Sequence, residues 1–143
     1  MSKIRRVLIA VDDSVQSARA VKKGVKMAIQ LDADVILVSV VDQADSIGDI
    51  DSGVLPEESK VILEKEERGV LNNYMRLFPD LNIATVILQG DPENAIVKYA
   101  EEMKVDLIVI GGHQKSFMEG LFTVNIRKYI FEHTRIPLLV VRE

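Results

Sequence analysis

The side chains best suited to chemistry stand directly after two apolar runs of the sequence. The first group is Asp12, Asp13 and Ser14, and the second is the stretch 111–114, which comprises Gly111, Gly112, His113 and Gln114. Ligands of open parallel sheets bind outside the carboxyl ends of strands, and a few convergent polar groups orient them there. These two groups therefore form the first hypothesis for a small-ligand site.

The acidic group also has a purely structural interpretation. Ser14 stands where a following helix needs an N-cap, and no G-x-S-x-G motif surrounds it, so we do not expect it to act as a nucleophile. Asp12 precedes the same helix, whose dipole favours a nearby carboxylate without any ligand. Helix capping and ligand contact both remain open for Asp12.

Metal or acid–base chemistry has little support in the sequence. The two histidines, His113 and His133, are far apart, and neither has a second histidine at metal-binding spacing. The acidic stretch 45–53 superficially resembles a calcium loop but lacks the bidentate glutamate at the required spacing. With no cysteine, the chain has no disulfides, thiolate catalysis or zinc–cysteine sites. Lys115, Arg127 and Lys128 could neutralise an anion, although exposed helix faces commonly carry such charges.

Buried strands and amphipathic helices alternate along the chain and must position these residues. Apolar and β-branched runs predict strands at 7–11, 35–41, 82–88, 106–110 and 137–141. Apolar side chains at helical spacing predict helices from Ser14 to about Ile29, from Pro56 to about Phe78, from a capped start at Asp91-Pro92 to about Met103, and from Met118 to Ile130. This pattern is typical of an α/β fold, a single open parallel five-stranded sheet with helices on both faces.

The length and composition fit one globular domain that covers residues 1–143. The composition is 48% hydrophobic and 28% charged, which excludes disordered and fibrous classes. The net charge of -4, with scattered basic residues, argues against a nucleic-acid partner. No apolar run approaches the ~20 residues that cross a bilayer. The N-terminus also lacks a secretory apolar region. We therefore expect no membrane association and a cytoplasmic location.

Motifs spread over the whole chain resemble the universal stress protein family. Val11-Asp12-Asp13-Ser14 is similar to the V-D-x-S at the end of the family's first strand. The match continues through Gly90-Asp91-Pro92, residues 106–111, His113 and residues 136–142. The resemblance implies a Rossmann-like fold of the adenine nucleotide alpha hydrolase type with strand order 3-2-1-4-5. It also implies a homodimer through the last strand, Pro137 to Val141, which agrees with the need of an exposed edge strand for a partner.

The phosphate-binding motif of the family is only partly kept. Members that bind ATP carry G-x-x-G-x9-G-[ST] after the fourth strand, whose glycines let backbone amides approach the phosphates. Gly111 matches the first glycine, whereas Gln114, Val124 and Asn125 occupy the other three positions. The stretch 111–114 is more similar to the branch typified by universal stress protein A, which is generally regarded as not binding ATP.

The adenosine half of the family site is better preserved than the phosphate half. Asp12 and the backbone of Val40 and Val41 occupy the positions that meet adenine and ribose in nucleotide-binding members. The resemblance thus implies a candidate nucleotide site with a degenerate motif, made of Asp12, Ser14, Val40, Val41, Gly111, Gly112, His113, Gln114 and Asn125.

These observations predict a homodimeric regulatory protein of the stress response that acts through protein contacts, is not an enzyme and requires no cofactor. The alternative is a stress sensor that binds ATP or AMP without turnover. A phosphoacceptor receiver domain also begins with a strand ending in two aspartates, but Asp91 lies in a Gly-Asp-Pro turn instead of ending the third strand. A hydrolase or transferase lacks a Walker lysine motif, paired histidines and a thiol.

Overall fold

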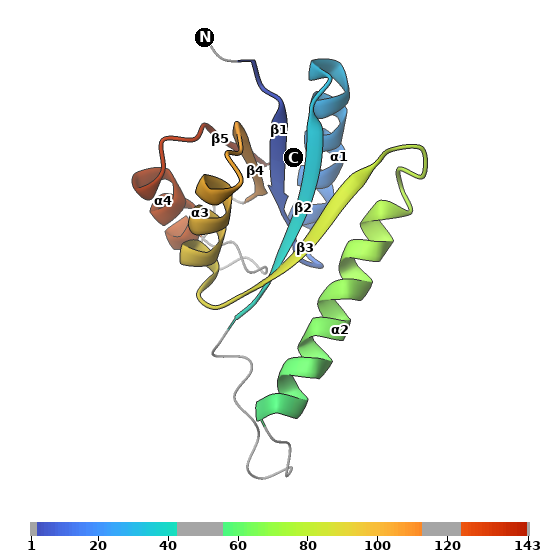
Figure 1. Cartoon of the computed structure of the whole chain (residues 1–143), viewed down its shortest axis with the longest axis vertical. Coiled ribbons are helices and arrows are strands. Elements are labelled where there is room, and N and C mark those ends of the chain that lie inside the picture. The colour runs from blue at the N-terminus through green and yellow to red at the C-terminus, as the bar shows by residue number, and fades with distance from the viewer. Residues whose placement is uncertain (1–2, 43–55, 113–123, 143) are drawn as a thin grey trace.

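The computed structural model of the chain describes residues 3–42, 56–112 and 124–142 (Figure 1). Five strands and four helices alternate along these residues. The strands are β1 (Arg6–Ala10), β2 (Asp34–Val41), β3 (Ile83–Gln89), β4 (Leu107–Gly111) and β5 (Leu138–Val141). The helices are α1 (Val15–Leu31), α2 (Pro56–Met75), α3 (Pro92–Glu102) and α4 (Val124–His133).

The strands form one parallel sheet in the order β3-β2-β1-β4-β5. This confirms the predicted fold class and strand order. The predicted element bounds differ slightly, since α2 ends at Met75 instead of near Phe78 and β3 begins at Ile83 instead of Asn82. The predicted start of the fourth helix at Met118 lies outside the described residues. No helix of the described chain is both long and apolar enough to cross a bilayer.

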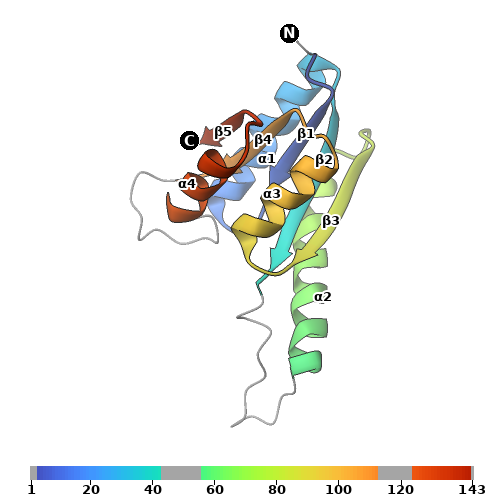
Figure 2. The same ribbon diagram turned by 60° about the vertical axis from the view of Figure 1, so that its left-hand side comes forward.

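Two apolar layers enclose the sheet, and each is built from alternate side chains of the same strands. On one face, Val7 and Ile9 of β1 pack in a cluster with residues of α1 and with Leu71 of α2. On the other face, Leu8 and Ala10 of β1 pack in a cluster with residues of α3 and α4. Figure 2 shows α3 and α4 in front of the sheet and α1 behind it. Helices therefore cover both faces, as the alternating elements predicted.

The start of α3 differs in one detail from the capped start predicted there. Gly90 adopts φ 119°, a conformation that side chains other than glycine rarely take, and so allows the tight turn after β3. Asp91 occupies the N-cap position with extended backbone, but its side chain makes no capping hydrogen bond. Pro92 at the start of α3 removes one N–H that would otherwise need a partner.

The order of the strands brings three predicted site segments together at the carboxyl end of the sheet. The chain passes from β1 to β2 on one side and later returns to β4 on the other side of β1. This reversal creates the topological switch point at which open α/β sheets bind ligands. The carboxyl ends of β2, β1 and β4 are consequently adjacent, and they carry Val41, Asp12 and Gly111.

We expect the packing of α2 against the sheet to depend on Leu71, whose side chain is fully buried there. Leu71→Ala should lower the free energy of unfolding by about 2–5 kcal/mol, because it removes buried apolar surface and leaves a cavity. The matched control is Leu77→Ala, since Leu77 is 52% exposed, and it should change stability by less than about 0.5 kcal/mol. Chemical denaturation followed by circular dichroism measures both; equal losses would contradict the packing described above.

Candidate functional site

The turn between β1 and α1 is held by the side chains of Asp12, Ser14 and Ser17. The Asp12 Oδ1 atom accepts hydrogen bonds from the Ser14 backbone N–H and from the Ser17 hydroxyl, both at 2.8 Å. The Ser17 hydroxyl also accepts from the Asp12 backbone N–H at 2.9 Å, and the Ser14 hydroxyl accepts from the Ser17 N–H at 3.1 Å. Ser14 is thus the N-cap of α1, as predicted.

Asp12 has the structural role at the start of α1, which the sequence had left open as one of two alternatives, the other being ligand contact. Its side chain is buried, with 8% of the residue exposed, and it orders the first turn of α1. Ser17 was missed as a member of this group. Its position three residues after the N-cap, where the backbone N–H donates the capping hydrogen bond, was the available signal.

Tyr74 connects α2 to this turn and was also missed. Its hydroxyl donates a buried hydrogen bond of 2.8 Å to the backbone carbonyl of Asp12, which is distant in sequence. Burial, helped by the negative charges of Asp12 and Asp13, raises the pKa of Tyr74 to about 12. The phenol therefore stays protonated near neutral pH and remains a donor to the end of β1.

The two glycines at the carboxyl end of β4 each have a close neighbour that explains why a side chain would not fit. A Cβ atom at Gly111 would lie 2.3 Å from the backbone oxygen of Gln16, in the first turn of α1. A Cβ atom at Gly112 would lie 2.7 Å from Cζ and Nη1 of Arg127, a side chain of α4. Burial lowers the pKa of this guanidinium. Both glycines thus serve packing at the carboxyl end of the sheet.

The remaining predicted residues lie at the same edge or outside the described chain. Val40 and Val41 end β2 and are buried, and the Val41 carbonyl accepts a hydrogen bond from the Gly90 N–H at 3.1 Å. Asn125 is exposed in the first turn of α4. His113 and Gln114 lie outside the described residues. The structure therefore brings Asp12, Ser14, Val40, Val41, Gly111 and Gly112 to adjacent strand ends.

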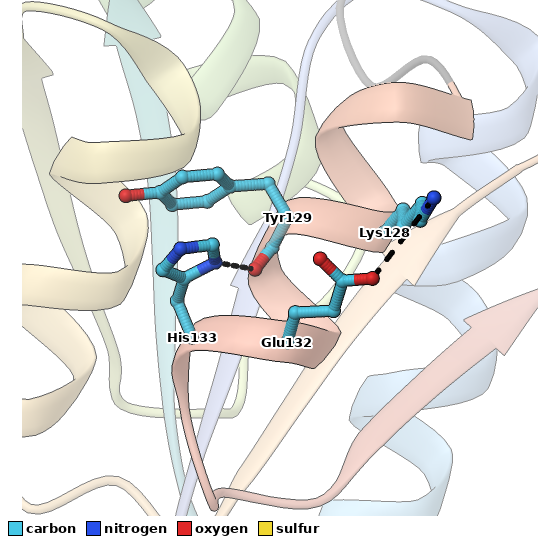
Figure 3. A network of polar contacts seen from close by, with 4 residues as sticks. All are labelled: Lys128, Tyr129, Glu132 and His133. Atoms are coloured by element: carbon cyan, nitrogen blue, oxygen red, sulfur yellow. Dashed lines mark hydrogen bonds and ion pairs between the residues drawn. The ribbon is translucent and has the colours of Figure 1, made fainter.

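The second histidine takes part in helix structure. His133 is exposed at the end of α4; its Nδ1 donates to the carbonyl of Tyr129 at 2.8 Å, and its ring stacks on the Tyr129 ring (Figure 3). Lys128 and Glu132 form an exposed ion pair beside them. Within the described ranges, no group of three acidic or histidine side chains is arranged to hold a metal ion.

Nearly the whole chain matches one family of proteins. The model of the universal stress protein family matches residues 3–142. The chain belongs to this family. Among curated relatives of this universal stress protein, MJ0531 from Methanocaldococcus jannaschii is 30% identical over 151 residues, which cover 97% of this chain and 82% of the relative. The predicted family is confirmed, whereas the branch typified by universal stress protein A stays a prediction.

Solved structures of other family members have the same fold. Universal stress protein UspA from Lactobacillus plantarum superposes with a TM-score of 0.79 at 22% identity, over 99% of this chain and 100% of that one. A universal stress protein from Archaeoglobus fulgidus, solved in complex with dAMP, superposes with a TM-score of 0.67 at 18% identity, over 99% and 100% of the two chains.

The packing at Gly111 predicts a stability effect that needs no ligand. Gly111→Ala should lower the free energy of unfolding by about 1–3 kcal/mol, because the added Cβ meets the backbone of Gln16. The matched control is Gly69→Ala in α2, where no atom lies within 4 Å of the added Cβ. The control should be stabilised by about 1 kcal/mol through helix propensity. Denaturant titration without nucleotide measures both, and an unchanged stability of Gly111→Ala would refute the packing role.

Proposed function

We propose that this universal stress protein is a homodimeric regulatory protein of the stress response that acts through protein contacts and has no catalytic activity of its own. The observation that supports this proposal is the open edge of the sheet at β5. In the described chain β5 pairs with β4 alone, and Leu138, Leu139 and Val140 of this strand are only half-buried. An apolar edge strand of this kind is a template for pairing with another strand.

Helix α4, which precedes β5 in the chain, also carries two exposed apolar side chains. Phe131 is 72% exposed and Val124 is 36% exposed. They are seven residues apart in the helix and therefore point to the same side. Exposed apolar side chains on one side of a helix favour a protein interface. A second copy of the chain that paired through β5 would cover the edge.

The alternating hydrogen bonds of β5 suggest how to test dimerisation without disturbing the monomer. Pro137 and Val141 direct their carbonyl groups toward β4, where they accept from Ile108 and Gly112. Since successive residues of a strand alternate in direction, the N–H of Val140 faces the open edge. This N–H is available to a pairing strand, and its removal leaves the bonds to β4 in place.

We expect Val140→Pro to convert a wild-type dimer into a folded monomer, because proline removes the outward N–H and edge strands tolerate it. Val140→Thr is the matched control, since it keeps the N–H and should stay dimeric. Sedimentation equilibrium gives the mass of each, and circular dichroism verifies the fold. A monomeric wild type, or a proline variant that remains fully dimeric, would contradict pairing through β5.

A second candidate function, the binding of an adenine nucleotide without turnover, has its own supporting observation. Asp12, Val40, Val41, Gly111 and Gly112 stand on neighbouring strand ends at the switch point of the sheet. The relative from Archaeoglobus fulgidus was solved with dAMP, a nucleotide with a single phosphate. In this chain Val124 and Asn125 replace the last two motif residues, and Arg127 covers Gly112. These features favour AMP over ATP as a ligand.

Restoring the glycines of the phosphate motif tests this candidate. The double variant Gln114→Gly with Val124→Gly should strengthen ATP binding at least about tenfold, which corresponds to about 1.4 kcal/mol, because backbone amides regain access to the phosphates. AMP affinity should change much less. Calorimetric titration measures both, and chromatography should recover the nucleotides unhydrolysed. A wild type that binds ATP more tightly than AMP would refute the preference.

A further inference from the structure

The exposed face of α1 carries charges of one sign only. The helix contains four basic residues and no acidic one, and all four basic side chains are exposed. The buried residues of α1 lie on the opposite side, where they pack against the sheet. At about 100° per residue, the four basic positions fall within roughly one third of the helix circumference. This basic face of α1 consists of Arg19, Lys22, Lys23 and Lys26.

The other helices of the described chain carry charges of both signs. The sequence of α2 contains five glutamates and three basic residues, and that of α3 contains three glutamates and one lysine. In α4, Lys128 forms an ion pair with Glu132. Mixed signs of this kind are typical of helix faces that contact water alone. The uniform sign of the basic face is therefore a feature of α1 that a solvated helix does not need.

The four cations oppose the folding of α1 instead of supporting it. Lys22 and Lys23 each follow Arg19 and precede Lys26 by three or four residues, which makes them neighbours on the helix surface. Like charges at this spacing destabilise a helix. No acidic side chain of the described residues forms an ion pair with any of the four. Their repulsion would be relieved by an anionic partner bound over the basic face.

Two exposed apolar side chains lie near the ends of the basic face. Val15 is 63% exposed and Ile29 is 56% exposed. They are separated by about four turns, or roughly 21 Å, and therefore lie on the same side of α1 as the four cations. Protein interfaces combine apolar contacts, which hold the partner, with charges that steer and orient it. The face of α1 has both elements in one row.

We propose that the basic face of α1 binds an acidic segment of a partner protein, with Val15 and Ile29 contacting apolar side chains at the two ends of that segment. The proposal rests on the regulatory role through protein contacts proposed above, and it names the chemistry of the partner. Figure 2 shows α1 on the opposite side of the sheet from α3 and α4, so this surface is separate from the exposed side chains of α4.

Charge favours a short acidic segment over an extended polyanion. The whole chain has a net charge of -4, so a nucleic acid or an anionic bilayer would be repelled by the rest of the molecule while it met the basic face. A short segment escapes most of this repulsion, because charges farther than about 8 Å away are largely screened at physiological ionic strength. A second copy of the chain is also a poor match, since its described helices α2, α3 and α4 mix both signs.

A synthetic peptide tests the surface directly. The probe is a fluorescein-labelled helical peptide that carries four glutamates at the spacing of the four cations and one leucine at each end of that run. Replacing the four cations with glutamine should weaken its binding at least about tenfold, which fluorescence anisotropy measures at about 0.15 M salt. The variant combines Arg19→Gln, Lys22→Gln, Lys23→Gln and Lys26→Gln. All four side chains are exposed, so the variant should fold, and circular dichroism verifies this.

A charge-matched control separates this surface from the net charge of the molecule. It should weaken peptide binding less than about twofold. It removes four exposed lysines from the other helices through Lys60→Gln, Lys65→Gln, Lys98→Gln and Lys128→Gln. Equal losses in the two variants would show a general attraction between charges and would overturn the proposal. Failure of the wild type to bind the peptide would overturn it as well.

The apolar ends have their own readout. Val15→Thr combined with Ile29→Thr should weaken peptide binding at least about threefold and leave the binding of polyglutamate, which has no apolar side chains, unchanged. The matched control is Val61→Thr with Ile62→Thr, a pair in α2 that is about half-exposed, and it should change neither affinity. Full peptide affinity in the α1 double variant would overturn the proposed arrangement.

Other anions and the state of assembly distinguish the remaining outcomes. A short DNA duplex and phosphatidylserine vesicles should bind more weakly than the peptide, and tighter binding of either would overturn a protein partner. Sedimentation equilibrium of the wild type measures dimerisation separately. A dimer that does not bind the peptide contradicts this inference alone, whereas a monomer that binds it contradicts only the homodimer.

Discussion

The architecture depends on β1 being buried on both faces and flanked on both edges. Its residues Val7 to Ala10 are completely buried, and their side chains enter the two apolar layers in alternation. The chain continues from β1 to β2 on one side and reaches β4 on the other, which creates the switch point of the sheet. Among the described residues of the candidate site, Asp12, Ser14, Val40, Val41, Gly111 and Gly112 are positioned by this one strand and its two neighbours.

Packing engages the groups at the carboxyl end of the sheet that form the candidate site. Asp12 orders the first turn of α1 and receives Tyr74 on its carbonyl, while Gly111 and Gly112 accommodate Gln16 and Arg127. These contacts give Asp12, Gly111 and Gly112 a structural role that does not depend on an intact phosphate motif. The proposed regulatory role rests instead on the open edge at β5, and the binding of a small adenine nucleotide at this carboxyl end is the second candidate.

The sequence predicts the elements of this fold well because their signals are local. Apolar periodicity located the five strands and four helices of the described residues, and Ser14 was recognisable as an N-cap from its neighbours alone. The hydrogen bond from Tyr74 to Asp12 was not predictable, since it joins residues 62 positions apart. The role of Gly111 beside Gln16 also required the packed helix.

Native mass spectrometry of the protein purified under gentle conditions tests the central claim most directly, because one spectrum reports both the assembly and any retained ligand. The account predicts the mass of two chains without ATP, and added AMP is the ligand that could increase this mass. A single chain, or a species that retains one ATP per chain through purification, would contradict the account. Such a result would show that the edge at β5 stays open or that the degenerate motif still holds a triphosphate.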